Sequence, residues 1–248
     1  MKAWRRFLAA VAFLTRAPIP ESIQVDEASL TESPPWFPAV GLLIGGFIAA
    51  FDWIASAVLP SAVVAVADLA AIFMITGGLH LDGLLDTADG LLSGKPREKA
   101  LEIMKDSRVG AMGVSAGILV IALKAAAIAS LAGDLRWQGL LLAPILGRYV
   151  MAVGISAFPY ARGAGLGALF SSKANGQLTA LSGIIVASLS VAVAGIRGAA
   201  GFLAAVLGSV LLARKVTRQL GGLTGDVYGA LCELSETALL LVFAARWP

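Results

Sequence analysis

Long apolar stretches, repeated along almost the whole chain, restrict most strongly how this sequence can fold. A transmembrane helix needs about 20 consecutive, mostly apolar residues, and several stretches meet or approach that length. They are residues 37–59, 61–81, 110–132, 137–158, 178–196, 198–213 and 227–246. The chain is 58% hydrophobic and only 14% charged, whereas soluble domains carry about 25% charged residues. We therefore predict an all-α, polytopic membrane bundle of about seven transmembrane helices, forming a single domain over residues 1–248.

The N-terminal residues predict a helix that lies in the membrane interface. Within residues 3–15 a short apolar run follows Arg5 and Arg6, but Arg16 ends the run early and no convincing cleavage site follows. This pattern favours an interfacial amphipathic helix over a cleaved signal peptide. Trp4, Phe7 and Phe13 are expected to face lipid, and the Arg residues are expected to face headgroups.

The Lys and Arg residues between the stretches predict the orientation of the chain in the membrane. With the N-terminus in the cytoplasm, the inside segments hold Lys2, Arg5, Arg6, Arg16, Lys95, Arg97, Lys99, Lys105, Arg108, Arg162, Lys173, Arg214, Lys215 and Arg218. The outside segments hold only Arg136, Arg197 and Arg246. This bias predicts a cytoplasmic N-terminus and an external C-terminus, and it places the loops that carry polar motifs on the cytoplasmic side.

Three aspartates follow the second apolar stretch. On a continuous helix Asp82, Asp86 and Asp89 are spaced i, i+4 and i+7 and fall within about 60° of one another. Crowded carboxylates repel each other, and a divalent cation removes that cost. No Lys or Arg occurs between Gly77 and Gly94. The pattern therefore predicts a site for Mg²⁺, Mn²⁺ or Ca²⁺, and the alternative is a helix end that simply faces water.

His80 is the only histidine of the chain. On the same helix it points about 160° away from Asp82, so it is not expected to bind the same metal ion. A substrate contact, a general-base role and a packing hydrogen bond are all left open.

A second acidic cluster comprises Asp226, Glu233 and Glu236 in and before the last apolar stretch. Asp226 and Glu233 share a helix face, and carboxylates inside a membrane span are functional by default. Asp226 is expected at the same membrane level as Asp82, so the two can face one pocket. For Asp68, within the second stretch, a helix-packing hydrogen bond is favoured slightly over support of Asp82.

Cations near these carboxylates are expected to bind phosphate oxygens. The 93–108 loop is predicted to form a short helix from Pro96, with Lys95, Arg97 and Lys99 solvated. The candidate substrate-binding residues are Lys105, Asp106, Ser107, Arg108, Arg148 and Arg162. Metal-binding carboxylates beside phosphate-binding cations indicate phosphoryl or phosphodiester transfer, with one substrate lipophilic or held at the membrane.

These motifs together resemble the signature of the cobalamin synthase family, the adenosylcobinamide-GDP ribazoletransferases. The resemblance rests on Gly78-x-His80-x-Asp82-Gly83-x-x-Asp86-Thr87-x-Asp89-Gly90 and on Glu102-Ile103-Met104-Lys105-Asp106-Ser107-Arg108-x-Gly110. It extends to Thr15-Arg16-x-Pro18-x-Pro20, Arg148, Tyr160-x-Arg162, Gly225-Asp226 and Glu233. It implies a Mg²⁺-dependent transferase of the bacterial inner membrane that acts on a corrinoid-GDP and α-ribazole or its 5′-phosphate, with no nucleic acid partner. A homo-oligomer is left open.

We therefore hypothesise roles for both clusters. The catalytic candidates are Asp82, Asp86, Asp89, Asp226, Glu233 and His80, and the Mg²⁺ ligands among them are Asp82, Asp86, Asp89 and Asp226. The competing interpretations are a membrane phosphotransferase of the CDP-alcohol type and an ion-coupled transporter, since intramembrane carboxylates also mark ion pathways.

Overall fold

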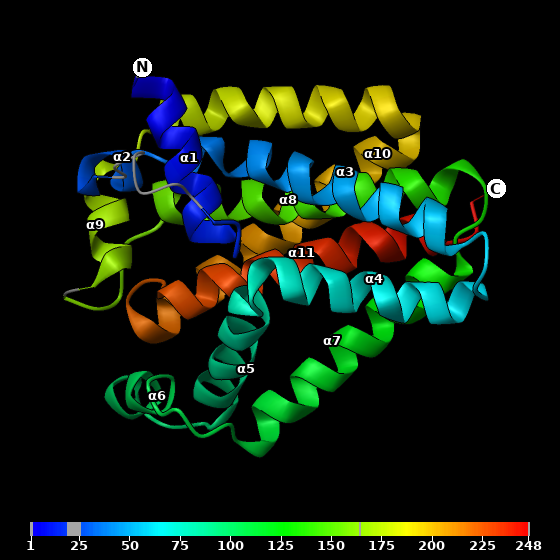
Figure 1. The fold of residues 1–248 in the computed structure, drawn as a ribbon. Helices are drawn as coiled ribbons and strands as arrows, with labels where there is room; N and C mark the ends of the chain where they lie inside the picture. The colour runs from blue at the N-terminus through cyan, green and yellow to red at the C-terminus, as the bar shows by residue number, and fades with distance from the viewer. Residues whose placement is uncertain (1, 19–25, 164, 248) are drawn as a thin grey trace.

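The computed structural model describes residues 2–18, 26–163 and 165–247, and Pro20 of the motif above lies outside these ranges. In chain order its helices are α1 (Lys2–Leu14), α2 (Glu27–Thr31), a 3₁₀ turn (Pro34–Trp36), α3 (Phe37–Ala55), α4 (Ser61–Thr76), α5 (Leu79–Leu92), α6 (Arg97–Ile103), α7 (Ala111–Ser130), α8 (Asp134–Ala157), α9 (Leu166–Lys173), α10 (Gly176–Leu220) and α11 (Gly225–Ala244). No β-strand occurs in these described ranges. Figure 1 shows the long helices running side by side, so the expected all-α membrane bundle is confirmed.

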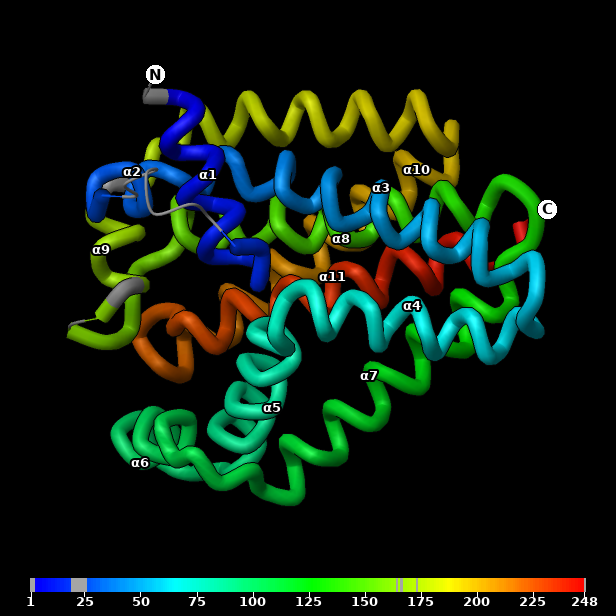
Figure 2. Tube along the Cα trace, viewed as in Figure 1, coloured from blue at the N-terminus to red at the C-terminus, as the bar shows by residue number. Residues whose placement is uncertain are grey.

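The described helices supply close to the predicted number of membrane spans. Within the described residues, five helices are long and apolar enough to cross a membrane, and the bent pair α4–α5 is a candidate for a sixth span. Helix α10 has non-helical backbone at Ala194 and Gly195, and the chain turns back there (Figure 2). It therefore supplies two antiparallel segments where we expected the fifth and sixth stretches, and its second segment continues past residue 213 to Leu220. The N- and C-termini lie at opposite ends of the bundle (Figure 1), as an odd number of crossings requires.

One expected boundary was wrong. The second stretch was predicted to continue to residue 81, but α4 ends at Thr76 and α5 leaves it at an angle of 94°. Gly77 and Gly78, which join the two helices, both have positive φ angles, 66° and 73°. Only glycine adopts this conformation without steric cost, so the Gly-Gly pair makes the elbow.

Helix α1 is confirmed, but its aromatic residues face differently from the prediction. Trp4 is exposed, whereas Phe7 packs against Trp36, and Phe13 packs against Phe37 and Phe170. Phe7 and Phe13 therefore attach α1 to the bundle instead of facing lipid alone. The reason is that α1 buries the face formed by Leu8, Ala9, Ala10 and Leu14.

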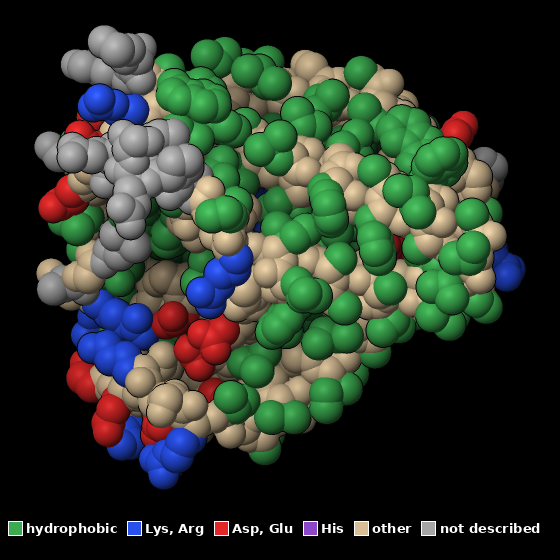
Figure 3. Space-filling view, viewed as in Figure 1, with side chains coloured by type: hydrophobic (Ala, Val, Ile, Leu, Met, Phe, Trp, Pro, Cys, Tyr) green, Lys and Arg blue, Asp and Glu red, His purple; other side chains and the backbone are tan. Residues whose placement is uncertain are grey.

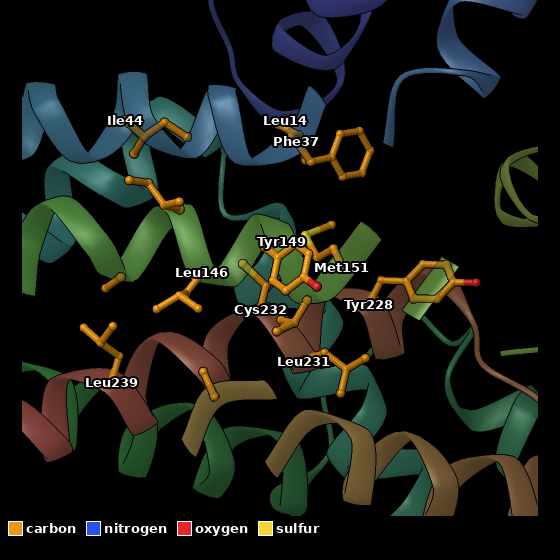
Figure 4. Close-up of a cluster of buried hydrophobic side chains, with 14 of the residues drawn as sticks. Leu14, Phe37, Ile44, Leu146, Tyr149, Met151, Tyr228, Leu231, Cys232 and Leu239 are labelled. Atoms are coloured by element: carbon orange, nitrogen blue, oxygen red, sulfur yellow. The ribbon is translucent and has the colours of Figure 1, made fainter. Parts of the chain in front are cut away.

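The core surrounds α8, and the charges gather at one end of the bundle. Figure 4 shows buried side chains from α1, α3, α8 and α11 converging, among them Phe37, Leu146 and Leu231. We call the end of the bundle with the N-terminus, α2, α6 and α9 the polar end. Lys, Arg, Asp and Glu side chains cluster there, and apolar side chains cover the rest of the visible face (Figure 3). At the other end Arg136 pairs with Asp52 at 2.6 Å and lies 3.6 Å from Asp68, so Asp68 contributes to helix packing and not to the polar end.

Candidate functional site

Helices α5 and α11 approach each other at backbone distance near the polar end, and two glycines permit it. A Cβ atom added to Gly83 would lie 2.6 Å from the carbonyl oxygen of Asp226, and one added to Gly229 would lie 2.9 Å from the carbonyl oxygen of His80. Both distances are shorter than van der Waals contact. The small residues therefore bring the acidic segments of the two helices together, as small residues do between membrane helices.

This approach assembles carboxylates from both helices. Asp82 and Asp226 line one cavity of about 200 Å³, as expected from their common membrane level. Asp86 is half-buried, and it lies within electrostatic range of Asp82, Asp226 and Asp89, with Arg162 as the opposing charge. Negative charge at this site thus exceeds the nearby positive charge.

The donor set of these carboxylates suits a hard cation, but it is not a closed cage. Within the described residues, no group of three or more His, Cys, Asp or Glu side chains converges closely enough to hold a metal ion alone. Mg²⁺ does not require such a cage, because it is usually bound by one or two carboxylates together with waters and substrate phosphates. Asp82, Asp86 and Asp226 fit that requirement.

Arg162 is fixed beside Asp226 by the loop that carries it. The backbone of this loop is tied to the α10–α11 connection, since Ala161 N–H donates to Leu223 O and Leu223 N–H donates to Pro159 O, both at 2.8 Å. The Arg162 guanidinium then donates to Asp226 Oδ2 at 2.8 Å. The predicted proximity of this arginine to the acidic site is thus observed, although its charge is engaged by a carboxylate.

Asp89 has a structural contact that helical spacing alone does not reveal. Its Oδ2 accepts a hydrogen bond from Gly110 N–H at 2.6 Å, and its Oδ1 accepts one from Gly113 N–H at 2.8 Å. Both carboxylate oxygens therefore hold the start of α7 against α5. The role of Asp89 as a metal ligand stays a prediction.

The segment between α6 and α7 carries four of the candidate substrate-binding residues. Lys105, Ser107 and Arg108 are exposed. The Arg108 guanidinium donates to both oxygens of Asp106, at 3.0 and 2.7 Å, and these hydrogen bonds lower the pKa of Asp106 to about 2. Asp106 is therefore ionised throughout the neutral pH range, and its carboxylate takes up two of the N–H donors of the Arg108 guanidinium.

Three other candidates, Glu233, Arg148 and His80, belong to a buried network, and His80 also lines the cavity of Asp82 and Asp226. Lys124 on α7 donates to Glu233 at 2.5 Å and to Glu236 at 2.6 Å. Arg148 on α8 pairs with Glu236, and its Nη2 lies 3.4 Å from His80 Nδ1. These contacts join four helices. They give Glu233 and Arg148 ion-pair partners inside the bundle. The catalytic role of Glu233 and the phosphate contact of Arg148 stay predictions.

Two basic residues make contacts that the sequence did not predict. Lys124, a charged residue inside the apolar stretch 110–132, is the central cation of the network. Arg97, which we expected to be solvated, donates to Leu220 O at 2.7 Å and to Ala161 O at 3.0 Å. Arg97 therefore holds α6 against the loops that position Arg162. Helix α6 itself begins after Pro96, as predicted.

The sequence was compared with known proteins. It matches the family described as cobalamin-5-phosphate synthase over residues 6–244. It is 42% identical to the adenosylcobinamide-GDP ribazoletransferase of Desulfitobacterium hafniense (strain Y51), with 100% of both chains covered. It is 42% identical to the protein of the same name from Roseiflexus sp. (strain RS-1), over 96% of this chain and 89% of that one. No solved structure matches. This chain belongs to the cobalamin-5-phosphate synthase family.

Proposed function

We propose that this protein is an adenosylcobinamide-GDP ribazoletransferase, which joins adenosylcobinamide-GDP to α-ribazole or its 5′-phosphate and releases GMP. The names of its relatives support the reaction, since they cover almost the full length of the chain. The observation that carries the assignment to a site is the meeting of Asp82 and Asp86 on α5 with Asp226 on α11, beside Arg162.

In the proposed reaction, the ribose 3′-hydroxyl oxygen attacks the phosphorus that bears the aminopropanol arm. A new P–O bond forms, the P–O bond to the GMP phosphate breaks, and the hydroxyl proton passes to a base. Asp82, exposed at the cavity, and Asp226 are the carboxylates with access to that proton. Arg162 would orient Asp226 through their ion pair.

The site residues that fit Mg²⁺ are Asp82, Asp86 and Asp226, with phosphate oxygens of the substrate completing the set. When bound there, Mg²⁺ would neutralise part of the diphosphate charge. Asp89 would hold the loop that carries Lys105 and Arg108 close to the substrate. The predominance of Lys and Arg at the polar end supports a cytoplasmic orientation of the site in the bacterial inner membrane.

The test is incubation of the purified protein with adenosylcobinamide-GDP, α-ribazole and Mg²⁺ while GMP release is followed. We expect stoichiometric GMP and a joined corrinoid product, and loss of both when EDTA removes the metal. Release of GMP without a joined product would contradict the proposal. Uptake of substrate into sealed vesicles without turnover would favour the transporter instead, and a lipid product would favour a transferase of the CDP-alcohol type.

A further inference from the structure

A second cavity lies at the elbow between α4 and α5, and Asp82 is also part of its lining. Its volume is about 570 Å³, and its lining includes Arg16, Thr15, Gly77, Gly78 and Asp82. This volume lies within the range of about 300–1,000 Å³ that is usual for small-molecule sites. The cavity shares Asp82 with the carboxylate site, so a ligand in it reaches that site directly.

Arg16 is held over the glycine elbow by its own backbone. Its N–H donates to Ile75 O at 2.7 Å, one residue before α4 ends. Its guanidinium lies directly against Gly77, where an added Cβ atom would collide with the Arg16 Nε and Cζ atoms. The positive φ angle of Gly77 and the absence of a side chain there thus leave the space that the guanidinium occupies.

The Arg16 guanidinium can accept an anionic partner, whereas the arginines that we expected to bind phosphate are engaged by carboxylates. Within the described part of the chain, no carboxylate lies within ion-pair distance of Arg16, whereas Arg108, Arg148 and Arg162 each pair with one. Lys105 is exposed and is not part of the lining of this cavity. Arg16 is therefore the cation in a position to meet an anion beside Asp82.

The start of α5 adds to the preference for an anion. Gly78 is the N-cap of this 14-residue helix, and no side chain caps its first turn. Uncapped N–H groups and the positive end of the helix dipole favour a phosphate group. Gly78 and Leu79, at this helix end, line the same cavity as the Arg16 guanidinium.

We propose that the elbow cavity binds the diphosphate of the nucleotide-activated substrate, with Arg16 as its principal cation. The inference rests on the proposed function and gives a specific role to Arg16, which so far stood only within the Thr15-Arg16-x-Pro18-x-Pro20 motif. The guanidinium of an arginine binds phosphate oxygens in a bidentate manner, and Asp82, which lines this cavity, also belongs to the carboxylate site. A diphosphate between Arg16 and a cation held by Asp82 would have its charge balanced from both sides.

The first test is steady-state GMP release by wild type, Arg16→Ala, Arg16→Lys and Arg5→Ala in detergent free of phospholipid. The matched control is Arg5, which is exposed like Arg16 and lies on α1, the helix that ends just before Arg16. Loss of a charged hydrogen bond corresponds to about tenfold to a hundredfold in affinity. We expect Arg16→Ala to raise the KM for adenosylcobinamide-GDP by that factor without changing the KM for α-ribazole, and Arg16→Lys to recover part of the loss. An unchanged KM for adenosylcobinamide-GDP would overturn the inference.

Binding of GDP to the same proteins, measured by calorimetry with Mg²⁺ present, keeps the test independent of turnover. Arg16→Ala should weaken GDP binding relative to wild type and Arg5→Ala, at an unchanged unfolding temperature. Equal GDP affinity of wild type and Arg16→Ala would overturn the inference, even if the wild type proved active. A wild type that binds GDP through Arg16 but releases no GMP would contradict the proposed function alone.

A lipid phosphate has the same chemistry as a substrate phosphate, so a third arm separates the two. The kinetic comparison is repeated in vesicles that contain anionic phospholipid. If Arg16→Ala differs from wild type only in those vesicles, Arg16 binds a headgroup and the inference is overturned. A KM difference of the same size in detergent and in vesicles supports the substrate site.

Discussion

Gly83 on α5 faces the backbone of Asp226 on α11, with no room between them for a single methyl group. This contact positions the carboxylates of one helix against those of the other. It explains why a helix that leaves α4 at 94° can still contribute to a site shared with the last helix of the chain.

The first prediction concerns that contact. Gly83→Ala should push α5 from α11 and cost about 1–3 kcal/mol of stability, as overpacking does. A displacement of about 1 Å at a reactive site can reduce turnover about a hundredfold, so GMP release should fall by one to two orders of magnitude. Gly46→Ala, on α3 with open space around it, is the control and should retain activity. Equal activity of the two variants would show that the close approach is unimportant.

The second prediction concerns the buried network. Glu236→Gln removes the charge that pairs with both Lys124 and Arg148. Breaking a buried ion pair costs about 3–5 kcal/mol, because a charge stays buried without its partner. Thermal unfolding in detergent should therefore occur at a clearly lower temperature.

The control for this network is Glu102→Gln. Glu102 pairs with Lys99 on the surface of α6, where both side chains are more than half exposed, and such pairs contribute at most about 1 kcal/mol. If Glu236→Gln unfolded at the temperature of Glu102→Gln, the network would have no role in stability.

The third prediction concerns Asp89. Asp89→Ala removes both acceptors for the amides of Gly110 and Gly113, which should release the segment before α7. Because Lys105 and Arg108 are exposed there, limited trypsin digestion should cleave this segment faster than in wild type. Cleavage at Arg5, on the far helix α1, serves as the internal standard. Unchanged relative rates would mean that Asp89 does not hold the loop.

Hydropathy and spacing predicted the framework of this protein well. Apolar stretches of helical length predicted the bundle, and the i, i+4, i+7 spacing placed Asp82, Asp86 and Asp89 on one helix. The elbow was missed because apolar composition continues through it, although the adjacent Gly77 and Gly78 were the available signal. The pattern of apolar residues predicts where a helix forms and which face it buries. It does not predict the angle between that helix and the next one.

Interactions between helices could not be predicted in the same way. Arg148 and Glu236 are far apart in the sequence, as are Asp89 and Gly113, and each pair meets only after the helices have packed. Residue type alone made Arg148 a phosphate-binding candidate, because a sequence does not show which carboxylate will neutralise an arginine. Arg16 received no individual role because Gly77 and Asp82, which line the same cavity, are far from it in the sequence.

We propose that carboxylates of α5 and α11 together bind a divalent cation with the substrate diphosphate. Mn²⁺ can take the place of Mg²⁺ in oxygen-ligand sites, and its binding to the purified protein in the presence of GDP can be followed by electron paramagnetic resonance. We predict that Asp82→Asn and Asp226→Asn each weaken Mn²⁺ binding strongly, while Glu102→Gln leaves it as in wild type. Unchanged Mn²⁺ affinity in Asp226→Asn would contradict a site shared by the two helices.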